Sequence, residues 1–183
     1  MVVMGSQSLL KAGDAAPAFD LLGIDDKRYT ESSFRGYDAM LIVFMCNHCP
    51  YVKAKVGAIS EIHEKFKGRV AVVGINSNDS VAYPDDSFDH MKKFAAERKI
   101  GFFYLVDETQ EVAKKYGAIC TPDPFLFDKN NRLVFHGRID NAMNPADVAT
   151  EKTMIANIEK LLGGQKIAKD FDPSIGCSIK WKN

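Results

Sequence analysis

The amino-acid sequence predicts an α/β fold in which a central mixed β-sheet is flanked by helices. Three observations lead to this prediction. Short apolar runs of strand length alternate with segments of helical period, the last runs form a pair around a polar turn, and a Cys-x-x-Cys pair directly follows one of the runs. At 183 residues, with 46% hydrophobic side chains, the chain suits one domain with a sizeable core.

The N-terminal part of the domain is predicted to form a β-hairpin. Residues 16–23 and 28–30 have the pattern of short extended pieces on either side of an Asp-Asp turn. Residues 40–45 are a continuous apolar run, long enough for a strand buried on both faces and too short for a helix. Residues 70–75 are a second such run, so two buried strands are expected.

An amphipathic helix is predicted between these two strands. Its apolar residues recur at spacings of three and four, with charged residues between them: Val52, Val56, Ile59, Ile62 and Phe66. Gly68 provides a common C-terminal end for a helix. Because a helical crossover joins the two strands, they are expected to be parallel.

The second half of the chain is predicted to complete the sheet. After a polar loop over residues 76–86, the pattern predicts a helix through Phe88, Met91, Phe94 and Ala95, a strand over 102–106 and a shorter helix over 109–116. Residues 125–127 and 133–139 then form a hairpin, and Val148, Ile155, Ile158 and Leu162 mark a last helix that ends at a glycine pair. This order implies parallel strands joined by crossovers and closed by an antiparallel hairpin.

Charge and hydropathy exclude several classes of partner. Lys plus Arg equals Asp plus Glu at 24 each, so no global field attracts nucleic acid or an anionic membrane. The first 13 residues lack the pattern of a leader, and no apolar run approaches the roughly 18 residues that a membrane span needs. The sequence therefore predicts a soluble, cytoplasmic protein without nucleic-acid or membrane partners.

The pair of cysteines at residues 46–50, Cys-Asn-His-Cys-Pro, lies where the predicted strand meets the predicted helix. Two thiols at this spacing can form a disulfide across one helical turn, with one sulfur exposed at the positive end of the helix. Helix N–H groups and a protonated His48 both favour a thiolate, so we expect the pKa of Cys46 below its ordinary value. Cys46 would then be the nucleophile and the more buried Cys49 the resolving thiol. Pro50 is well tolerated at a helix start.

Four cysteines are too few for a disulfide scaffold, and no second ligand pair stands at a spacing suitable for structural zinc. A redox role for the close pair is therefore favoured over a metal site, and we expect no cofactor. The chain divides most simply into an N-terminal tail (residues 1–12), one domain (residues 13–163) and a C-terminal extension (residues 164–183).

Five stretches of the sequence, taken in order, are typical of one superfamily: residues 13–19, 46–50, 116–122, 125–128 and 137–139. With them the chain resembles the thioredoxin-like superfamily, and within it the TlpA/ResA and AhpC/TSA type, which has an extra N-terminal β-hairpin. The resemblance implies a thioredoxin-like fold and a thiol-disulfide oxidoreductase in cell redox homeostasis. It also implies protein disulfide or dithiol substrates, a mixed-disulfide intermediate and an unidentified recycling partner, either a thioredoxin-type protein or a reductase.

The resemblance further implies a substrate platform opposite the cysteines. Pro122 would be the cis-proline that faces them, and Thr121 would offer backbone groups to an extended substrate segment. Pro124 is the competing candidate, but Pro122 stands three residues before the Phe-Leu-Phe strand, as the family's proline does. His48 occupies the slot of the histidine in DsbA-like Cys-Pro-His-Cys motifs, so the couple is expected to be less reducing than in thioredoxins with Gly-Pro in that turn.

Two positions depart from the thioredoxin pattern. Met45 stands where thioredoxins have a Trp, and Met40 stands where they have a buried Asp. The proton acceptor for Cys49 is therefore not identified by the sequence.

Two further cysteines are possible auxiliary thiols. Cys120 stands two residues before Pro122, close to the expected active-site face, and is either an auxiliary thiol or a small buried hydrophobe. Cys177 lies beyond the last helix, near Trp181, the single Trp of the chain, which indicates that the C-terminal extension docks onto the domain. Whether Cys177 reaches another thiol stays open.

Two other functions remain as alternatives. One is a Sco-like copper chaperone with two cysteines and a distant histidine, since soft thiolates select Cu(I), although Sco proteins have three residues between the cysteines and this chain has two. His136 alternates with Val134 and Arg138, and its default prediction is a solvated strand histidine. The other is a peroxiredoxin-like peroxidase, although Ile42 and Cys46 stand where its signature Pro and Thr are expected.

Overall fold

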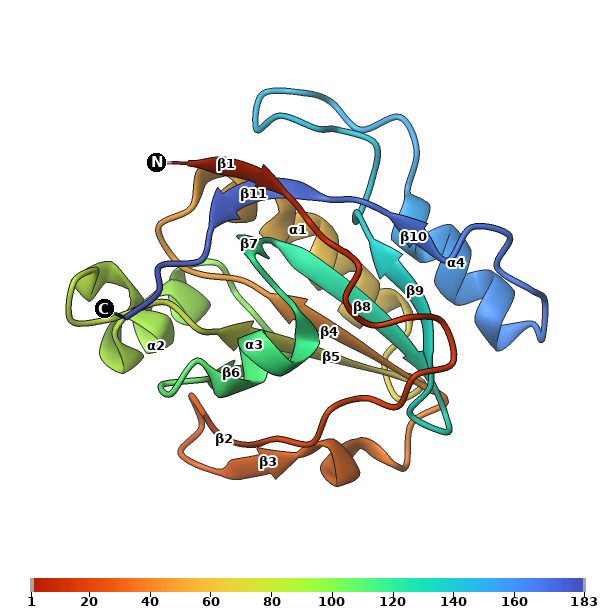
Figure 1. Ribbon diagram of the computed structural model, residues 1–183, viewed down its shortest axis with the longest axis horizontal. Coiled ribbons are helices and arrows are strands. Elements are labelled where there is room, and N and C mark those ends of the chain that lie inside the picture. Colours follow the sequence, from red (N-terminus) through yellow and green to blue (C-terminus); the bar gives the residue numbers. More distant parts are fainter. Residues whose placement is uncertain (1, 183) are drawn as a thin grey trace.

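The structure, a computed structural model, describes residues 2–182, which form two β-sheets with helices packed around the larger one (Figure 1). The strands are β1 (Val3–Gly5), β2 (Asp20–Gly23), β3 (Arg28–Thr30), β4 (Ala39–Phe44), β5 (Val70–Asn76), β6 (Phe103–Val106), β7 (Cys120–Thr121), β8 (Asp123–Asp128), β9 (Leu133–Gly137), β10 (Phe171–Asp172) and β11 (Ile175–Ser178). The α-helices are α1 (Pro50–Lys65), α2 (Phe88–Glu97), α3 (Glu111–Tyr116) and α4 (Thr153–Leu162).

The larger sheet has the strand order β10-β9-β8-β4-β5-β6-β2-β3. Strands β4, β5 and β6 run parallel, as helical crossovers require, whereas β8 runs antiparallel to β4 and closes the sheet with β9. The N-terminal hairpin of β2 and β3 is attached through β6. The predicted α/β fold with a mixed sheet flanked by helices and an N-terminal hairpin is confirmed.

Alternate side chains of β4 supply both layers of the core, which explains why this strand is apolar throughout. Leu41 and Val43 pack in the layer that contains α1, α2 and α4. Met40, Ile42 and Phe44 pack in the opposite layer with α3. The strand is therefore fixed from both faces, and so is the point at its carboxyl end where the first cysteine follows.

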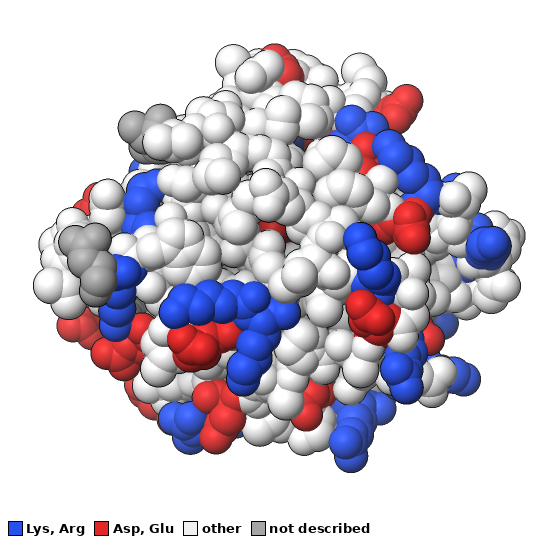
Figure 2. All heavy atoms as spheres, in the orientation of Figure 1, with Lys and Arg blue, Asp and Glu red and all other residues white. Residues whose placement is uncertain are grey.

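The smaller sheet has the order β1-β11-β7 and is antiparallel throughout. It joins the two ends of the chain, because β1 lies in the predicted N-terminal tail and β11 in the predicted C-terminal extension (Figure 1). Residues 1 and 183 of those segments lie outside the described residues. On the face seen in Figure 2, few charged side chains lie over β1 and β11, and Val3 of β1 is exposed.

The last helix begins later than predicted. Val148 lies before α4 and is 87% exposed, so its assignment to the helix is wrong. The reason is a turn next to Pro145: Asn144 N–H donates to Asp147 Oδ2 at 2.9 Å, and Asp147 N–H donates to the Asn144 carbonyl at 3.1 Å. Among the described residues, no helix is both long and apolar enough to cross a membrane.

Candidate redox site

The turn that carries Cys46 and Cys49 connects the end of β4 to the start of α1. Met45 N–H still bonds to the Ile75 carbonyl at 2.9 Å, which extends the contact with β5 up to the first cysteine. Cys49 is the N-cap of α1, and its carbonyl accepts the first helical hydrogen bond, from Lys53 N–H, at 3.0 Å. Pro50 occupies the first helical position, where a backbone donor would lack a partner within the helix.

Both sulfur-bearing residues are buried. Cys46 is 1% exposed and Cys49 is fully buried, so the expectation that one sulfur is exposed is wrong for this structure. Thr121 of β7 lies against both sulfurs, since Cys46 Sγ lies 3.4 Å from Thr121 Oγ1 and Cys49 Sγ lies 3.3 Å from the Thr121 carbonyl oxygen. All four cysteines are reduced.

The peptide bond between Thr121 and Pro122 is cis. Thr121 touches both sulfur atoms, so the structure places the predicted platform next to the predicted thiols. The backbone of Thr121 is paired with Cys177 of β11 in antiparallel register. A role of Thr121 and Pro122 in binding substrate stays a prediction.

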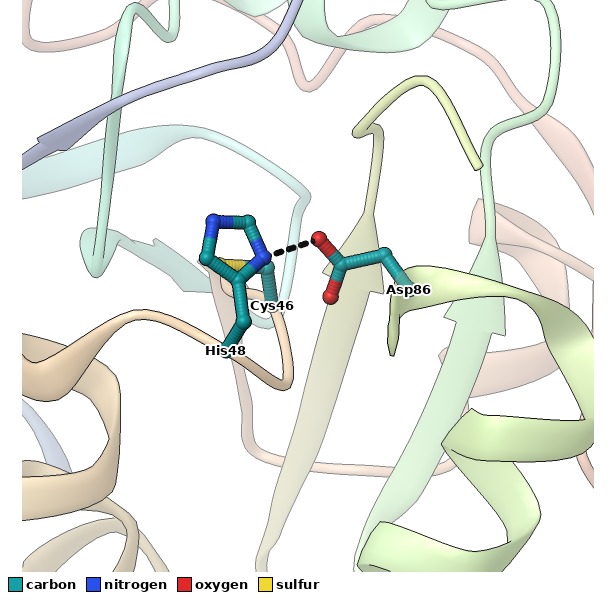
Figure 3. Close-up of side chains that lie close together, drawn as sticks. All are labelled: Cys46, His48 and Asp86. Carbon is teal, nitrogen blue, oxygen red and sulfur yellow. Dashed lines mark hydrogen bonds and ion pairs between the residues drawn. The ribbon is translucent and has the colours of Figure 1, made fainter. Parts of the chain in front are cut away.

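His48 is bonded to a carboxylate that the sequence did not single out (Figure 3). Its Nδ1 lies 2.6 Å from Oδ2 of Asp86, a buried residue of the loop that follows β5. The same carboxylate accepts the Asn47 backbone N–H at 2.7 Å and the Asn78 side-chain amide at 2.7 Å. The His48 ring also stacks on Tyr83, with centroids 5.6 Å apart.

These bonds shift the pKa of both partners. The hydrogen bond to Asp86 raises the pKa of His48, although burial opposes it. For Asp86, burial acts to raise the pKa, but the bonds from His48, Asn78 and Asn47 outweigh it and hold the pKa below its ordinary value. His48 and Asp86 therefore form an ion pair beside Cys46, in which the charge of the histidine is largely offset.

Asp86 was missed because the polar segment over residues 77–86 is predicted to be a solvated loop that caps the following helix, which is wrong for the buried Asp86. The available signal was topological. This loop leaves the carboxyl end of β5, and the carboxyl ends of neighbouring parallel strands lie at the same edge of a sheet, where sites form. Of the several polar residues in the loop, the sequence did not indicate which one would turn inward.

The two cysteines differ in pKa, in the opposite sense to the prediction. A hydrogen bond to Cys49, burial and the negative charge of Asp86 raise the pKa of Cys46 well above its ordinary value. The bond from Cys46 lowers the pKa of Cys49 to about 5 against burial, and the Cys177 thiol and the Val52 N–H support it. These surroundings favour the thiolate of Cys49 over that of Cys46, which faces a carboxylate.

The two auxiliary cysteines have different surroundings. Cys120 is fully buried in β7, where burial and the charge of Asp123 raise its pKa. Cys177 Sγ lies 2.6 Å from Cys49 Sγ, which answers the question that the sequence left open. Burial and the hydrogen bond to Cys49 raise the pKa of Cys177 to about 12.

His136 is not the solvated histidine that its alternation predicts. It is 1% exposed, its Nε2 lies 2.7 Å from Asp123 Oδ1, and its ring stacks on Phe125 with centroids 3.9 Å apart. The reason is that the rings of Phe125 and Phe171 pack against it, the second with centroids 5.1 Å apart. The ring of His136 therefore bonds to Asp123, whereas a Sco-like copper site would require it at the thiols.

Within residues 2–182, one group has side chains close enough to share a metal ion: Cys46, His48 and Asp86, whose ligand atoms lie within 4.8 Å of one another (Figure 3). Two of the three already bond to each other, and the pKa of Cys46 is raised, so the donors are arranged for mutual hydrogen bonding. Beside His48 lies a surface depression of about 260 Å³, lined by Asn47, His48, Lys53, Asp85, His90, Lys93, Phe94, Glu97 and Arg98.

Comparison with known proteins assigns the family. The sequence model of the AhpC/TSA family matches residues 12–136, which is more than half of the chain. The chain belongs to the AhpC/TSA family. Among curated proteins, it is 22% identical over 126 residues to the thiol-disulfide oxidoreductase ResA of Bacillus thuringiensis subsp. konkukian, covering 68% of each chain. It is also 28% identical over 113 residues to a peroxiredoxin of Aquifex aeolicus, covering 61% of this chain and 50% of the relative.

Solved structures extend the comparison to the whole chain. An uncharacterized conserved protein from Geobacillus kaustophilus is 39% identical, with a TM-score of 0.93 over 100% of this chain and 97% of that one. A hypothetical protein from Sinorhizobium meliloti is 36% identical, with a TM-score of 0.92 over 97% and 98%. The thioredoxin domain of a thiol-disulfide oxidoreductase from Bacteroides vulgatus, 17% identical with a TM-score of 0.65 over 82% and 97%, shows that the fold is thioredoxin-like.

Proposed function

We propose that the protein is a thiol-disulfide oxidoreductase that exchanges a Cys46-Cys49 dithiol with the disulfides of protein substrates. The observation that carries the proposal is the pair of thiols at a strand-to-helix junction, both in contact with Thr121, with one of them favoured as thiolate. Thiolate character is what makes a cysteine an efficient partner in exchange. The naming of ResA relatives as thiol-disulfide oxidoreductases supports the same reaction.

The hydrogen bond between the two cysteines supplies the first proton transfer. Cys46 donates to the Cys49 thiolate, and passage of that proton to Cys49 leaves Cys46 as the attacking thiolate. A bond then forms between Cys46 and one substrate sulfur, while the substrate disulfide breaks and its other sulfur leaves as a thiolate. That leaving thiolate takes the proton from Cys49.

Cys49 completes the exchange. As a thiolate it attacks Cys46 Sγ, the Cys46-Cys49 disulfide forms, and the second substrate sulfur leaves and takes up a proton from water. The substrate has gained two electrons and two protons; the enzyme has supplied both electrons and one proton, and water has supplied the other proton. A dithiol reductant, which we infer to be a thioredoxin-type protein or a reductase, restores the starting state. We infer reduction as the direction on the expectation of a cytoplasmic location.

Access to the thiols requires movement, because both cysteines are buried. Two segments cover them, β11 on the side of Thr121 and the loop around Asp86 on the side of His48. Displacement of one of these segments must precede attack on a protein disulfide. The depression beside His48 is the open surface at which we expect a protein substrate to approach.

Reduction of insulin disulfides by dithiothreitol, followed by turbidity, tests the proposal. The wild-type protein is expected to accelerate the reaction, and Cys46→Ser to abolish the acceleration. Cys120→Ser makes the same chemical change at a buried cysteine outside the pair and is expected to keep it. Circular dichroism verifies the fold of each variant.

Two assays on the same preparation separate the alternatives. Absence of disulfide turnover together with stoichiometric copper would replace the proposal with a metallochaperone. Rapid consumption of hydrogen peroxide without disulfide turnover would replace it with a peroxidase, the function in the name of the Aquifex aeolicus relative. The sequence argues against the latter, since Ile42 and Cys46 stand where a peroxiredoxin has its signature Pro and Thr.

A further inference from the structure

Strand β11 occupies the edge of β7 at Thr121, the residue that the resemblance to the thioredoxin-like superfamily assigns to an extended substrate segment. Cys177 pairs with Thr121 and Ser178 pairs with Cys120, in antiparallel register (Figure 1). A segment added to a sheet edge in this way gains main-chain hydrogen bonds and presents alternate side chains to the pocket below. The chain therefore places its own extended segment, with a cysteine in it, where a protein substrate is expected.

The position of β11 is held from several sides. Gly176 lies so close to β7 that a Cβ there would be 2.0 Å from the Thr121 carbonyl oxygen. Before the strand, Ser174 Oγ donates to the Pro122 carbonyl at 2.9 Å. After it, Ile179 N–H donates to the Ile119 carbonyl at 2.9 Å. These contacts bracket Cys177, so its position is determined by the backbone around it.

Three thiols meet at the start of α1 as a result. Cys177 Sγ lies 2.6 Å from Cys49 Sγ, and Cys49 also accepts a hydrogen bond from Cys46. All three residues are buried, and no rotation of a surface side chain is needed to bring the sulfurs together. Cys120 is the internal contrast, since it is equally buried in β7 but bonds to Ser174. Burial alone therefore does not bring a cysteine into the cluster.

We propose that Cys177 is a third catalytic thiol, which forms a disulfide with Cys49 and so exchanges with the Cys46-Cys49 disulfide. The inference rests on the proposed function, because substrate reduction supplies the Cys46-Cys49 disulfide. Cys177 loses its proton and attacks Cys49 Sγ. The Cys49-Cys177 bond forms, the Cys46-Cys49 bond breaks, and Cys46 leaves as a thiolate that takes up the proton. The step is an isomerisation without net oxidation, so it needs no further oxidant.

The exchange has two consequences for the cycle. Cys46, the sulfur that meets substrate, returns to its reduced state while the oxidising equivalent is kept between α1 and β11. The recycling reductant then acts on the Cys49-Cys177 disulfide. Until it does, this disulfide holds β11 in place beside Thr121. Two causes of the raised pKa of Cys177 are its hydrogen bond to Cys49 and the charge of Cys49, and both disappear once Cys49 is oxidised.

Oxidation of the Cys46→Ser variant with diamide tests the bond directly. This variant keeps three cysteines, and we expect two of them to stop reacting with iodoacetamide because they have formed a disulfide. Digestion of the monomer should then give a peptide that links Cys49 to Cys177. The double variant Cys46→Ser, Cys177→Ser should keep both of its thiols. The matched double variant Cys46→Ser, Cys120→Ser should still form the bond.

The wild-type protein tests the exchange. After oxidation by a limiting amount of insulin and quenching in acid, both the Cys46-Cys49 and the Cys49-Cys177 linked peptides are expected, and Cys177→Ser should give only the first. The proposal is overturned if natively folded Cys46→Ser keeps its three thiols, or if wild-type protein turns over insulin without the second peptide. A failure of the proposed function gives a different result. Cys46→Ser then forms the Cys49-Cys177 disulfide, but the wild-type protein reduces no insulin, and Cys177 has no catalytic role.

Discussion

The turn with Cys46 and Cys49 and the strand with Cys177 bring thiols to one place, but the fold holds them in different ways. The turn continues β4, a fully buried strand in the middle of an eight-stranded sheet. Strand β11 belongs to a three-stranded sheet whose other members have three and two residues. Small surface sheets open at a lower free energy than core strands. The core therefore presents the reacting pair, and β11 is the part that can give access to it.

Cys49→Ser is expected to have the largest effect on activity, because the Cys49 sulfur contacts both Cys46 of the turn and Cys177 of β11. We expect insulin reduction to fall about 1000-fold, since residues that act as a unit lose function together. Cys46 would then accumulate as a mixed disulfide with substrate, detected by mass spectrometry of the intact protein. If Cys49→Ser retained more than about a tenth of the wild-type rate, Cys49 could not be the resolving thiol.

Gly176→Ala separates the two regions by dislodging β11 and leaving the turn intact. The added Cβ would meet the Thr121 carbonyl at 2.0 Å, and overpacking of this kind costs about 1–3 kcal/mol. Urea unfolding should show that loss of stability, and alkylation of Cys49 under native conditions should become faster. Gly57→Ala is the matched control, because a Cβ at that helical position has no atom within 4 Å. Unchanged alkylation in Gly176→Ala would show that β11 is not the cover.

Asp86→Asn tests the other cover, the ion pair on the side of His48. The asparagine keeps a similar shape but loses charge-assisted bonds, so we expect a loss of about 1.5–3 kcal/mol at neutral pH. Removal of the negative charge should also lower the pKa of Cys46. Urea unfolding measures the first effect and the pH dependence of Cys46 alkylation measures the second. An unchanged alkylation profile would mean that Asp86 does not control Cys46.

The same pair predicts how stability depends on pH. The pKa of His48 is raised by folding, so its contribution is complete below the ordinary histidine value and is lost as pH rises through the raised pKa. The pKa of Asp86 is lowered, so its contribution is present above the ordinary aspartate value and is lost as pH falls through the lowered pKa. The stability difference between wild type and Asp86→Asn should therefore be largest between the ordinary pKa of aspartate and the ordinary pKa of histidine. It should shrink at lower and at higher pH. A difference independent of pH would contradict the ion pair.

The sequence predicts the core of the site and misses its cover, for a physical reason. Strand β4, helix α1 and the cysteines between them are contiguous, so local periodicity and the position of Pro50 suffice to predict them. Asp86 and Cys177 reach the site from distant segments, 38 residues beyond His48 and 128 residues beyond Cys49. The three- and four-residue strands β1 and β11 are too short for a period of two to stand out.

The pKa of Cys46 was predicted in the wrong direction for a related reason. The helix start and His48 are both visible in the sequence, and both favour a thiolate at the turn. The structure adds the Asp86 charge next to Cys46 and supplies Cys49 with donors from Cys177 and the α1 backbone. His136 shows the same dependence on distant residues, because Phe171 of β10 packs against its ring and Asp123 binds it.

Cys177→Ser is expected to have the smallest effect on turnover and the most specific effect on the thiols. Because Cys46 and Cys49 can still form their own disulfide, insulin reduction should fall by a factor of about 2–10, as when one member of a set can be bypassed. The bond from the Cys177 thiol helps to lower the pKa of Cys49, and a serine hydroxyl in that place is a shorter side chain that reaches the sulfur less well. Alkylation of Cys49 should therefore shift to higher pH, whereas Cys120→Ser should leave that profile in place. If Cys177→Ser left both rate and profile unchanged, the 2.6 Å contact between the two sulfurs would have no chemical role, and β11 would act on the site only by covering it.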